Sequence, residues 1–302
     1  MTKTTFIAWI KAARLRTLAL ALSGTFIASA IAFEQQQFRF IIFAFTMVTT
    51  LLLQILSNFA NDYGDYKHGT DNVNRVGPLR AVQSGAISEN QMKKAVIGMA
   101  VLSLISGLLL LYIALFSIIN YVFILFFIAG IAAIAAAVKY TIGANAFGYK
   151  GLGDVMVFLF FGIAAVSGTH FLYTLHFNAW VLMPAAAIGL LSAGVLNVNN
   201  LRDVDNDRQS GKITLVVRFG ARFGRIYHTL LIGTAVLLIM VYLAVYGKYY
   251  LLFSMVIPLI PLTLHIATIH KTTHAAALDP ELKRLSLSTL LLSGWVSAGI
   301  NL

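Results

Sequence analysis

The chain has 302 residues, of which 59% are hydrophobic and only 11% are charged, and its formal net charge is +11. Soluble domains carry about 25% charged residues, so this composition excludes an ordinary soluble domain. The chain has no cysteine, which excludes disulfides and thiol chemistry. Because the basic residues lie between long apolar runs, their charge indicates membrane orientation and binding of anionic lipid or diphosphate, and no nucleic-acid partner.

Nine apolar runs follow one another, each close to the roughly 20 residues that a helix needs to cross a bilayer. They are about Leu18–Phe33, Phe40–Phe59, Ala95–Leu115, Tyr121–Val138, Val155–Tyr173, Trp180–Asn197, Ile226–Tyr246, Tyr250–Ile269 and Leu285–Leu302. Helices are predicted because backbone polar groups in lipid must bond within their own segment. The runs are continuous rather than alternating, which argues against a β-barrel. We therefore predict an all-α, polytopic membrane bundle of about nine transmembrane helices, in a single domain over residues 1–302.

The segments between these runs differ strongly in charge. If the N-terminus is inside, 20 of the 22 Lys and Arg residues fall in the inside segments, which are 1–17, 60–94, 139–154, 201–225 and 270–284. The positive-inside rule then predicts a multi-pass protein of the inner (plasma) membrane with a cytoplasmic N-terminus. Ten of the 11 acidic residues share that face, so we expect the active site there.

The first acidic cluster follows the second apolar run. At 100° per residue, Asn58, Asn61, Asp62 and Asp65 fall within about 100° of arc if the helix continues through them. One face of the helix end then presents two carboxylates and two amides.

A second acidic cluster follows the sixth run. Asn199, Asp203 and Asp207 are spaced at i, i+4 and i+8, which again predicts a single stripe on a helix. Asp205 points away from that stripe, and we expect it to be solvated or paired with a basic residue.

Like charges four residues apart repel one another in an isolated helix, but bridging cations make the arrangement favourable. Mg²⁺ prefers oxygen ligands and is usually held by one or two carboxylates together with substrate phosphates. Zinc would need Cys or His ligands, which neither cluster supplies as a set. We predict a Mg²⁺ site formed by both clusters, with these ligands: Asn61, Asp62, Asp65, Asn199, Asp203 and Asp207. The alternative is that these residues serve only as polar helix ends.

These motifs resemble those of a known family. Asn61-x-x-x-Asp65 is similar to the first aspartate motif of UbiA-type prenyltransferases, and Asp203-x-x-x-Asp207 is similar to the second. Three further stretches look most like the branch that acts on 1,4-dihydroxy-2-naphthoate in menaquinone synthesis. They are Gly77-Pro-Leu-Arg80-Ala-Val-Gln83-Ser84-Gly85, Gly148-Tyr149-Lys-Gly151-Leu-Gly153-Asp154 and Gly211-Lys212-Ile-Thr214-Leu-Val-Val-Arg218-Phe-Gly220.

The sequence departs from the family pattern at two places. A further acidic residue found in many members is replaced by Gly69, with Asp71 two residues later. A Tyr-x-x-x-Lys element is not intact, since Tyr140 is followed by Ala144, and Lys150 is the candidate to replace its lysine.

The resemblance implies Mg²⁺-dependent transfer of a polyprenyl group from its diphosphate to an aromatic acid, with loss of diphosphate and CO₂. The catalytic carboxylates are then Asp62, Asp65, Asp203 and Asp207. Candidates to bind the diphosphate are Arg80, Lys150, Arg202 and Lys212, although inside loops carry such charges for orientation alone. Candidates to stabilise the allyl cation are Tyr63, Tyr140 and Tyr149, although aromatic belts at membrane interfaces are common.

Two alternatives remain open at this point. One is a related prenyltransferase for another acceptor such as 4-hydroxybenzoate. The other is a cation-coupled secondary transporter, but transporters usually place such carboxylates near the bilayer midplane, often within inverted repeats. Here the carboxylates lie at the ends of apolar runs, and no internal repeat is evident.

Overall fold

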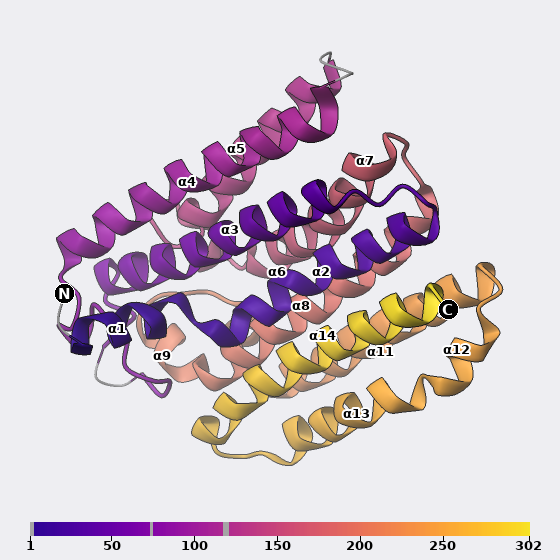
Figure 1. The fold of residues 1–302 in the computed structure, drawn as a ribbon. Coiled ribbons are helices and arrows are strands. Elements are labelled where there is room, and N and C mark those ends of the chain that lie inside the picture. The colour runs from indigo at the N-terminus through magenta and orange to yellow at the C-terminus, as the bar shows by residue number, and fades with distance from the viewer. Residues whose placement is uncertain (1–2, 73–74, 117–120) are drawn as a thin grey trace.

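The structure is a computed structural model that describes residues 3–72, 75–116 and 121–302. Within these residues every regular element is helical (Figure 1). The elements are α1 (Lys3–Ala13), α2 (Leu15–Glu34), α3 (Phe40–Lys67), α4 (Glu89–Leu115), α5 (Tyr121–Lys139), η2 (Phe147–Tyr149), α6 (Gly153–Val157), η3 (Phe158–Gly168), α7 (Thr169–Thr174), η4 (Ala179–Val181), α8 (Leu182–Arg202), α9 (Val204–Gln209), α10 (Leu215–Phe219), α11 (Ala221–Val245), α12 (Tyr249–Ser254), α13 (Val256–Lys271), η5 (Ala275–Leu278) and α14 (Asp279–Ile300).

Eight helical segments in the described part of the chain are long and apolar enough to cross a membrane, and the chain is a multi-pass membrane protein. The last helix, α14, has 22 residues but a more polar sequence. Its hydroxyl groups bond to carbonyls one turn earlier, as Ser286 does to Leu282 and Thr289 does to Leu285. Together with α14, the described residues form nine long segments, which confirms the predicted helical bundle.

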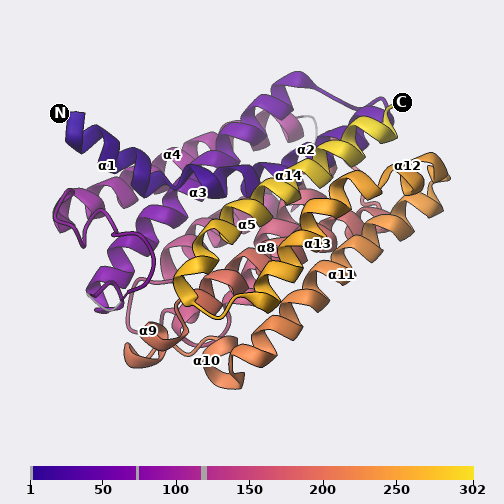
Figure 2. The same cartoon turned by 90° about the horizontal axis from the view of Figure 1, so that it is seen from below.

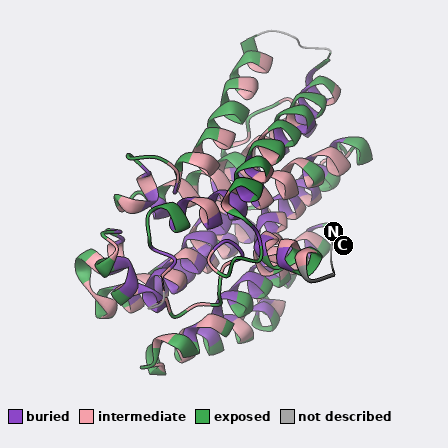
Figure 3. Ribbon diagram, turned by 90° about the vertical axis from the view of Figure 1, so that its left-hand side faces the viewer, coloured by how far each residue is buried: buried purple, intermediate pink, exposed green. Residues whose placement is uncertain are grey.

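Helix α8 lies at the centre of the bundle, where it packs against α11 and η3, while α2 packs against α14 and α3 against α4. Figure 1 shows α4 and α5 along one edge and α11 to α13 along the opposite edge, and Figure 2 shows α4 and α11 on opposite sides of the bundle. The buried residues gather along the inner helices (Figure 3). By contrast, no residue of α5, all of which is described, is buried by protein. Its apolar surface is therefore available to lipid.

Glycines bring η3, which is a π-helix, against the central helix α8. A Cβ added at Gly162 would lie 2.5 Å from the carbonyl oxygen of Ala185, and one added at Gly189 would lie 2.7 Å from that of Phe158. Small residues permit such close helix packing in membranes. π-Helices are rare and frequently lie at functional sites, and this one forms part of the cavity described below.

Candidate active site

The first acidic cluster lies on the last turns of α3, which continues as a helix to Lys67. One helix face therefore carries Asn58, Asn61, Asp62 and Asp65, as the spacing predicts. Asp62 is buried and accepts a hydrogen bond from Arg14 at 2.7 Å. The guanidinium of Arg80 lies 3.3 Å from the same oxygen.

Arg14 lies at the kink between α1 and α2, where its backbone has a φ of 51°. A residue with a side chain rarely adopts this left-handed conformation, which costs of order 1–3 kcal/mol. The kink lets α1 fold against α3, where the rings of Trp9 and Phe59 are 5.3 Å apart. The strained residue is thus one of those that contact the first cluster.

The segment after α3 folds back and adds two more arginines. Asp71 forms ion pairs with Arg75 at 3.0 Å and with Arg80 at 3.7 Å. Burial raises the pKa of Asp71 to about 6, although the two guanidinium groups oppose this shift. Because Arg80 contacts both Asp62 and Asp71, its side chain is held between two carboxylates.

The second cluster differs from the prediction of one continuous helical stripe. Helix α8 ends at Arg202, the backbone bends at Asp203, and α9 begins at Val204. The backbone N–H of Asp207 still donates to the carbonyl of Asp203 at 2.8 Å, so the i, i+4 relation of the two aspartates survives the bend. Asp205 is 83% exposed and lies 3.8 Å from Arg208, as expected for a residue outside the stripe.

Arg202 is completely buried and bonded to acidic and amide side chains. It donates to both carboxylate oxygens of Asp203, at 2.9 and 2.6 Å, to Asn199 at 2.8 Å, and to Asp279 at the start of α14. Burial alone would raise the pKa of Asp203, but this bidentate contact holds it below its usual value. These contacts of Arg202 position Asp203 and Asn199, and its predicted contact with the diphosphate stays a prediction.

Three contacts join the two clusters. Asn206 donates a hydrogen bond to the carbonyl of Thr70 at 2.8 Å, and the hydroxyl groups of Thr70 and Tyr149 are 2.6 Å apart. Tyr149 donates to Asp65 at 2.8 Å. The helix ends that carry the clusters, which are separate in the sequence, therefore meet at one end of the bundle.

Lys212 lies at this junction. Its ammonium is 3.6 Å from Asp207 and 5.7 Å from the centre of the Tyr149 ring. Burial disfavours the charged form, but Asp65 and Asp207 outweigh that effect and raise the pKa of Lys212 above its usual value. Burial also raises the pKa of Asp207 to about 6, against the attraction of Lys212. Lys212 thus stays positively charged beside both clusters.

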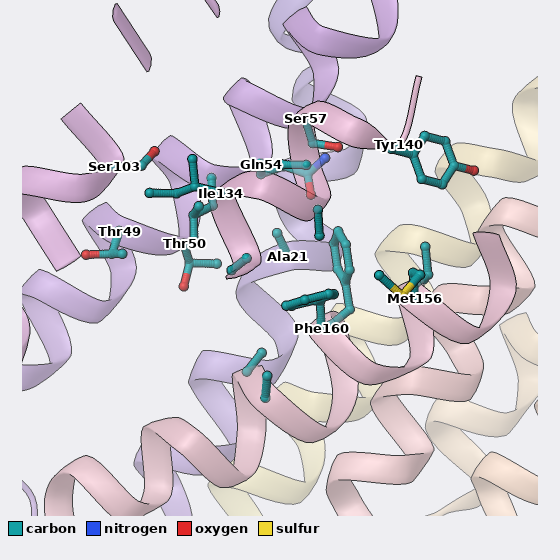
Figure 4. A pocket seen from close by; sticks show the side chains of 18 of the residues that line it. Ala21, Thr49, Thr50, Gln54, Ser57, Ser103, Ile134, Tyr140, Met156 and Phe160 are labelled. Carbon is teal, nitrogen blue, oxygen red and sulfur yellow. The ribbon is translucent and has the colours of Figure 1, made fainter. Parts of the chain in front are cut away.

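A cavity of about 600 Å³ extends from this charged end into the bundle. Its charged end is lined by Arg14, Arg16, Asp65, Arg80 and Lys212, and the remaining wall is mostly apolar. Figure 4 shows Tyr140, Met156 and Phe160 around this space, with Thr49 and Ser103 farther along it. The cavity can hold a molecule with an anionic head and a long hydrocarbon tail.

The predicted site residues take three kinds of position. Those that line the cavity are Asn61, Asp65, Arg80, Tyr140, Asn199 and Lys212. Those whose side chains contact a lining residue from behind are Asp62, Asp207, Arg202 and Tyr149, while Asp203 reaches the lining residue Asn199 through its backbone N–H. The other two lie apart: Tyr63 packs in an apolar cluster with Phe59, and Lys150 is exposed and donates to Asn145 at 2.7 Å.

Sequence reasoning missed Thr70, Asn206 and Asp279. The sequence gives one relevant signal, an Asp-Pro pair that is typical of a helix start, at Asp279. Nothing in the sequence pairs this carboxylate with Arg202, 77 residues earlier. The two hydrogen bonds of Thr70 and Asn206 likewise depend on loops meeting in space.

The described residues contain no ready group of three His, Cys, Asp or Glu side chains that could hold a metal ion. The donors around the junction nevertheless suit a hard cation, because they are carboxylate and amide oxygens. Two buried oxygens, Oδ2 of Asp207 and Oδ1 of Asn206, have no hydrogen-bond partner among the described residues. The residues present therefore fit Mg²⁺ if phosphate oxygens of a substrate complete its coordination.

The profile of the UbiA prenyltransferase family matches residues 19–287. The 1,4-dihydroxy-2-naphthoate octaprenyltransferase of Haemophilus influenzae is 39% identical over 296 residues, which cover 97% of this chain and 95% of that protein. The apo structure of a UbiA homolog from Aeropyrum pernix K1 has a TM-score of 0.67 at 16% identity, covering 95% of this chain and 98% of that one. A UbiA homolog from Archaeoglobus fulgidus, bound to DMAPP and Mg²⁺, has a TM-score of 0.55 at 17% identity, covering 95% and 99%. Both solved structures share the helical fold.

Proposed function

Because the chain belongs to the UbiA prenyltransferase family, we propose that it moves a polyprenyl group from its diphosphate to 1,4-dihydroxy-2-naphthoate, releasing diphosphate and CO₂. The name of the Haemophilus influenzae relative supports this acceptor, and the reaction is a step of menaquinone synthesis. The observation that carries the proposal is the cavity, which joins a cationic end to a long apolar wall.

The cationic end suits the diphosphate of the prenyl donor. Lys212 and Arg80 both line it, and Arg80 is held in place by Asp62 and Asp71. Arginine matches phosphate oxygens through its planar set of donors, whereas lysine acts as a point charge. These fixed cations stabilise the negative charge that develops on the leaving diphosphate as the allylic C–O bond breaks.

We also propose that Mg²⁺ is required and that Asn61, Asp62, Asp65, Asn199, Asp203 and Asp207 hold it. When bound, Mg²⁺ neutralises charge on the diphosphate and so makes it a better leaving group. The unpartnered Oδ2 of Asp207 supports this assignment. The Mg²⁺ in the structure of the Archaeoglobus fulgidus homolog is a further reason to test it.

The apolar wall suits the rest of the donor. An allyl cation reacts readily with water, so its site must exclude water. The rings of Tyr140, Phe147 and Phe160 line the cavity, and the first two are 5.4 Å apart. Aromatic faces stabilise a nearby cation, so these rings are placed to protect and stabilise the allyl cation until the acceptor attacks it.

The acceptor is an aromatic acid and needs a cation for its carboxylate. Arg14 and Arg16 line the same cavity from the start of α2 and are the candidates. The ring carbon that bears the carboxylate then forms a C–C bond to the allyl cation, and loss of that carboxylate as CO₂ returns an electron pair to the ring.

We propose that the site faces the cytoplasm, with the N-terminus on the same side of the plasma membrane. The distribution of Lys and Arg, with 20 of 22 in the segments on that side, supports this orientation.

An acceptor screen tests the proposed function. The purified protein in lipid nanodiscs is given labelled polyprenyl diphosphate with 1,4-dihydroxy-2-naphthoate, with 4-hydroxybenzoate or with no acceptor. We expect prenylated naphthoquinol and CO₂ from the first mixture, loss of both with EDTA, and recovery with added Mg²⁺. Preference for 4-hydroxybenzoate would overturn the acceptor, and no transfer to either would overturn the enzyme assignment.

A further inference from the structure

One polar side chain in the wall of the cavity is not used by the mechanism above. Gln54 lines the cavity from α3, as Figure 4 shows, and its exposed fraction is only 7%. It lies 11 residues before Asp65, which corresponds to about 16 Å along a helix axis. Gln54 is therefore deeper in the membrane than the charged end of the cavity.

Two backbone carbonyls of the α1–α2 connection determine which way the Gln54 amide is turned. The hydroxyl of Thr17 donates to the carbonyl of Arg14 at 2.9 Å, and Asn58 Nδ2 donates to the carbonyl of Ala13 at 2.8 Å. Because a carbonyl can only accept, the nitrogen of the Asn58 amide must face Ala13, and its oxygen must face Gln54.

The Gln54 amide completes this network as a donor. Gln54 Nε2 donates to Asn58 Oδ1 at 3.3 Å and to the Thr17 hydroxyl at 3.2 Å. If the amide were flipped, two oxygens would face each other at Asn58. The hydrogen-bond network therefore assigns Nε2 to the protein contacts and leaves Oε1 for another partner.

Oε1 of Gln54 has less than 1 Å² of accessible surface and receives no hydrogen bond from any residue that the structure describes, so a ligand hydroxyl contacts it only after the side chain turns toward the cavity. Leaving a buried amide oxygen unpaired is costly, so such groups normally have a partner. A polyprenyl chain offers no donor, and an ionised diphosphate offers only acceptors. Of the substrates in the proposed reaction, only the dihydroxynaphthoate carries hydroxyl groups that can donate.

We propose that Gln54 Oε1 accepts a hydrogen bond from a ring hydroxyl of the aromatic acceptor and so selects hydroxylated acceptors. This inference rests on the proposed function. The position of Gln54 supports this proposal. Its amide is bonded to Thr17, which lies one turn after Arg14 and directly after Arg16, and these two arginines are the candidates to bind the acceptor's carboxylate. The acceptor then lies along the α2–α3 side, and the prenyl chain lies along the apolar wall.

The substitution Gln54→Met tests the inference in the full-length enzyme, because methionine keeps the length of the side chain and removes its acceptor. We expect the KM for 1,4-dihydroxy-2-naphthoate to rise about tenfold, the effect of one lost hydrogen bond at a buried site. The KM for polyprenyl diphosphate should stay within about twofold. The matched control is Thr25→Val, which removes another hydrogen bond between α2 and α3. That bond joins Thr25, which does not line the cavity, to Thr50, which does.

Competition with 1-hydroxy-2-naphthoate and 4-hydroxy-2-naphthoate gives a second measurement that does not depend on how much enzyme is folded. Each analogue keeps only one of the two ring hydroxyls. The wild-type enzyme should therefore bind the analogue without the hydroxyl that contacts Gln54 about tenfold more weakly than the other. Gln54→Met should bind both alike. An unchanged acceptor KM in Gln54→Met, or equal discrimination in both enzymes, overturns this inference while the proposed function stands. Failure of the wild-type enzyme to prenylate the naphthoate overturns the proposed function and this inference with it.

Discussion

The two acidic clusters obtain their counterions in opposite ways. The aspartates of the second cluster pair with Arg202 and Lys212, which lie within a few residues of them in the sequence. Asp62 of the first cluster pairs instead with Arg14, 48 residues away, and with Arg80 in the segment after α3. The second cluster is thus assembled by local sequence, whereas the first is completed only when two other segments fold onto α3.

The largest expected effect comes from removing one carboxylate of either cluster beside Lys212. Asp65→Ala and Asp207→Ala should each lower kcat by at least about a hundredfold, because each removes negative charge from the site where metal and diphosphate are neutralised. Steady-state assays at saturating Mg²⁺ and substrates measure this.

The matched control is Asp205→Ala, which removes an exposed carboxylate from the same segment and should change kcat by less than about twofold. If only one of the two site variants loses activity, the clusters do not act together.

The next effect separates the clusters by stability. Arg202→Met should lower the free energy of unfolding by about 3 kcal/mol, because it leaves the carboxylate of Asp203 buried without its partner. Arg14→Met should cost clearly less, since Asp62 keeps Arg80. Thermal unfolding of both variants in the same detergent compares them. A larger loss for Arg14→Met than for Arg202→Met would reverse the comparison.

A smaller effect is expected at Arg80, which contacts Asp62 and Asp71 through different nitrogens. Arg80→Lys keeps the charge but not the planar set of donors. We expect the KM for polyprenyl diphosphate to rise about tenfold, with the KM for the acceptor nearly unchanged. Equal changes in both KM values would show that Arg80 does not act on the diphosphate in particular.

The smallest effect concerns the link between the clusters. Tyr149→Phe removes the hydroxyl that bonds to Asp65 and lies beside that of Thr70. One such bond is worth about 1 kcal/mol, so we expect kcat to fall about threefold to fivefold. No change in kcat or in thermal stability would show that this link is dispensable.

The fold was largely predictable because lipid leaves few options. Continuous apolar runs in a membrane must be helical, and the Lys and Arg residues between them indicate how each span is oriented. The bend at Asp203 was not predictable, since the i, i+4, i+8 spacing is compatible with an unbroken helix. Nor was the kink at Arg14, because its left-handed conformation depends on α1 packing against α3.

The site was predictable to the extent that its chemistry is local. Asp62 and Asp65 share a face of α3 as their spacing predicts, and Asp203 and Asp207 keep their i, i+4 relation across the bend. Lys212 lies in a stretch that resembles the family. Arg202 shows the limit of this reasoning, since its pairing with Asp279 depends on the position of α14. Gln54 is a second example of this limit, because only its hydrogen bonds with Thr17 and Asn58 in the folded protein reveal that its oxygen has no partner among the described residues.

The central claim is that both clusters serve one diphosphate. Equilibrium binding of an unreactive polyprenyl thiolodiphosphate with Mg²⁺ tests it directly in the wild type, Asp65→Ala, Asp207→Ala and the double variant. We predict that each single variant weakens binding strongly and that the double variant loses little more, because residues that act as a unit are not additive. Two losses that simply add, or binding that is unchanged in either single variant, would contradict a shared site.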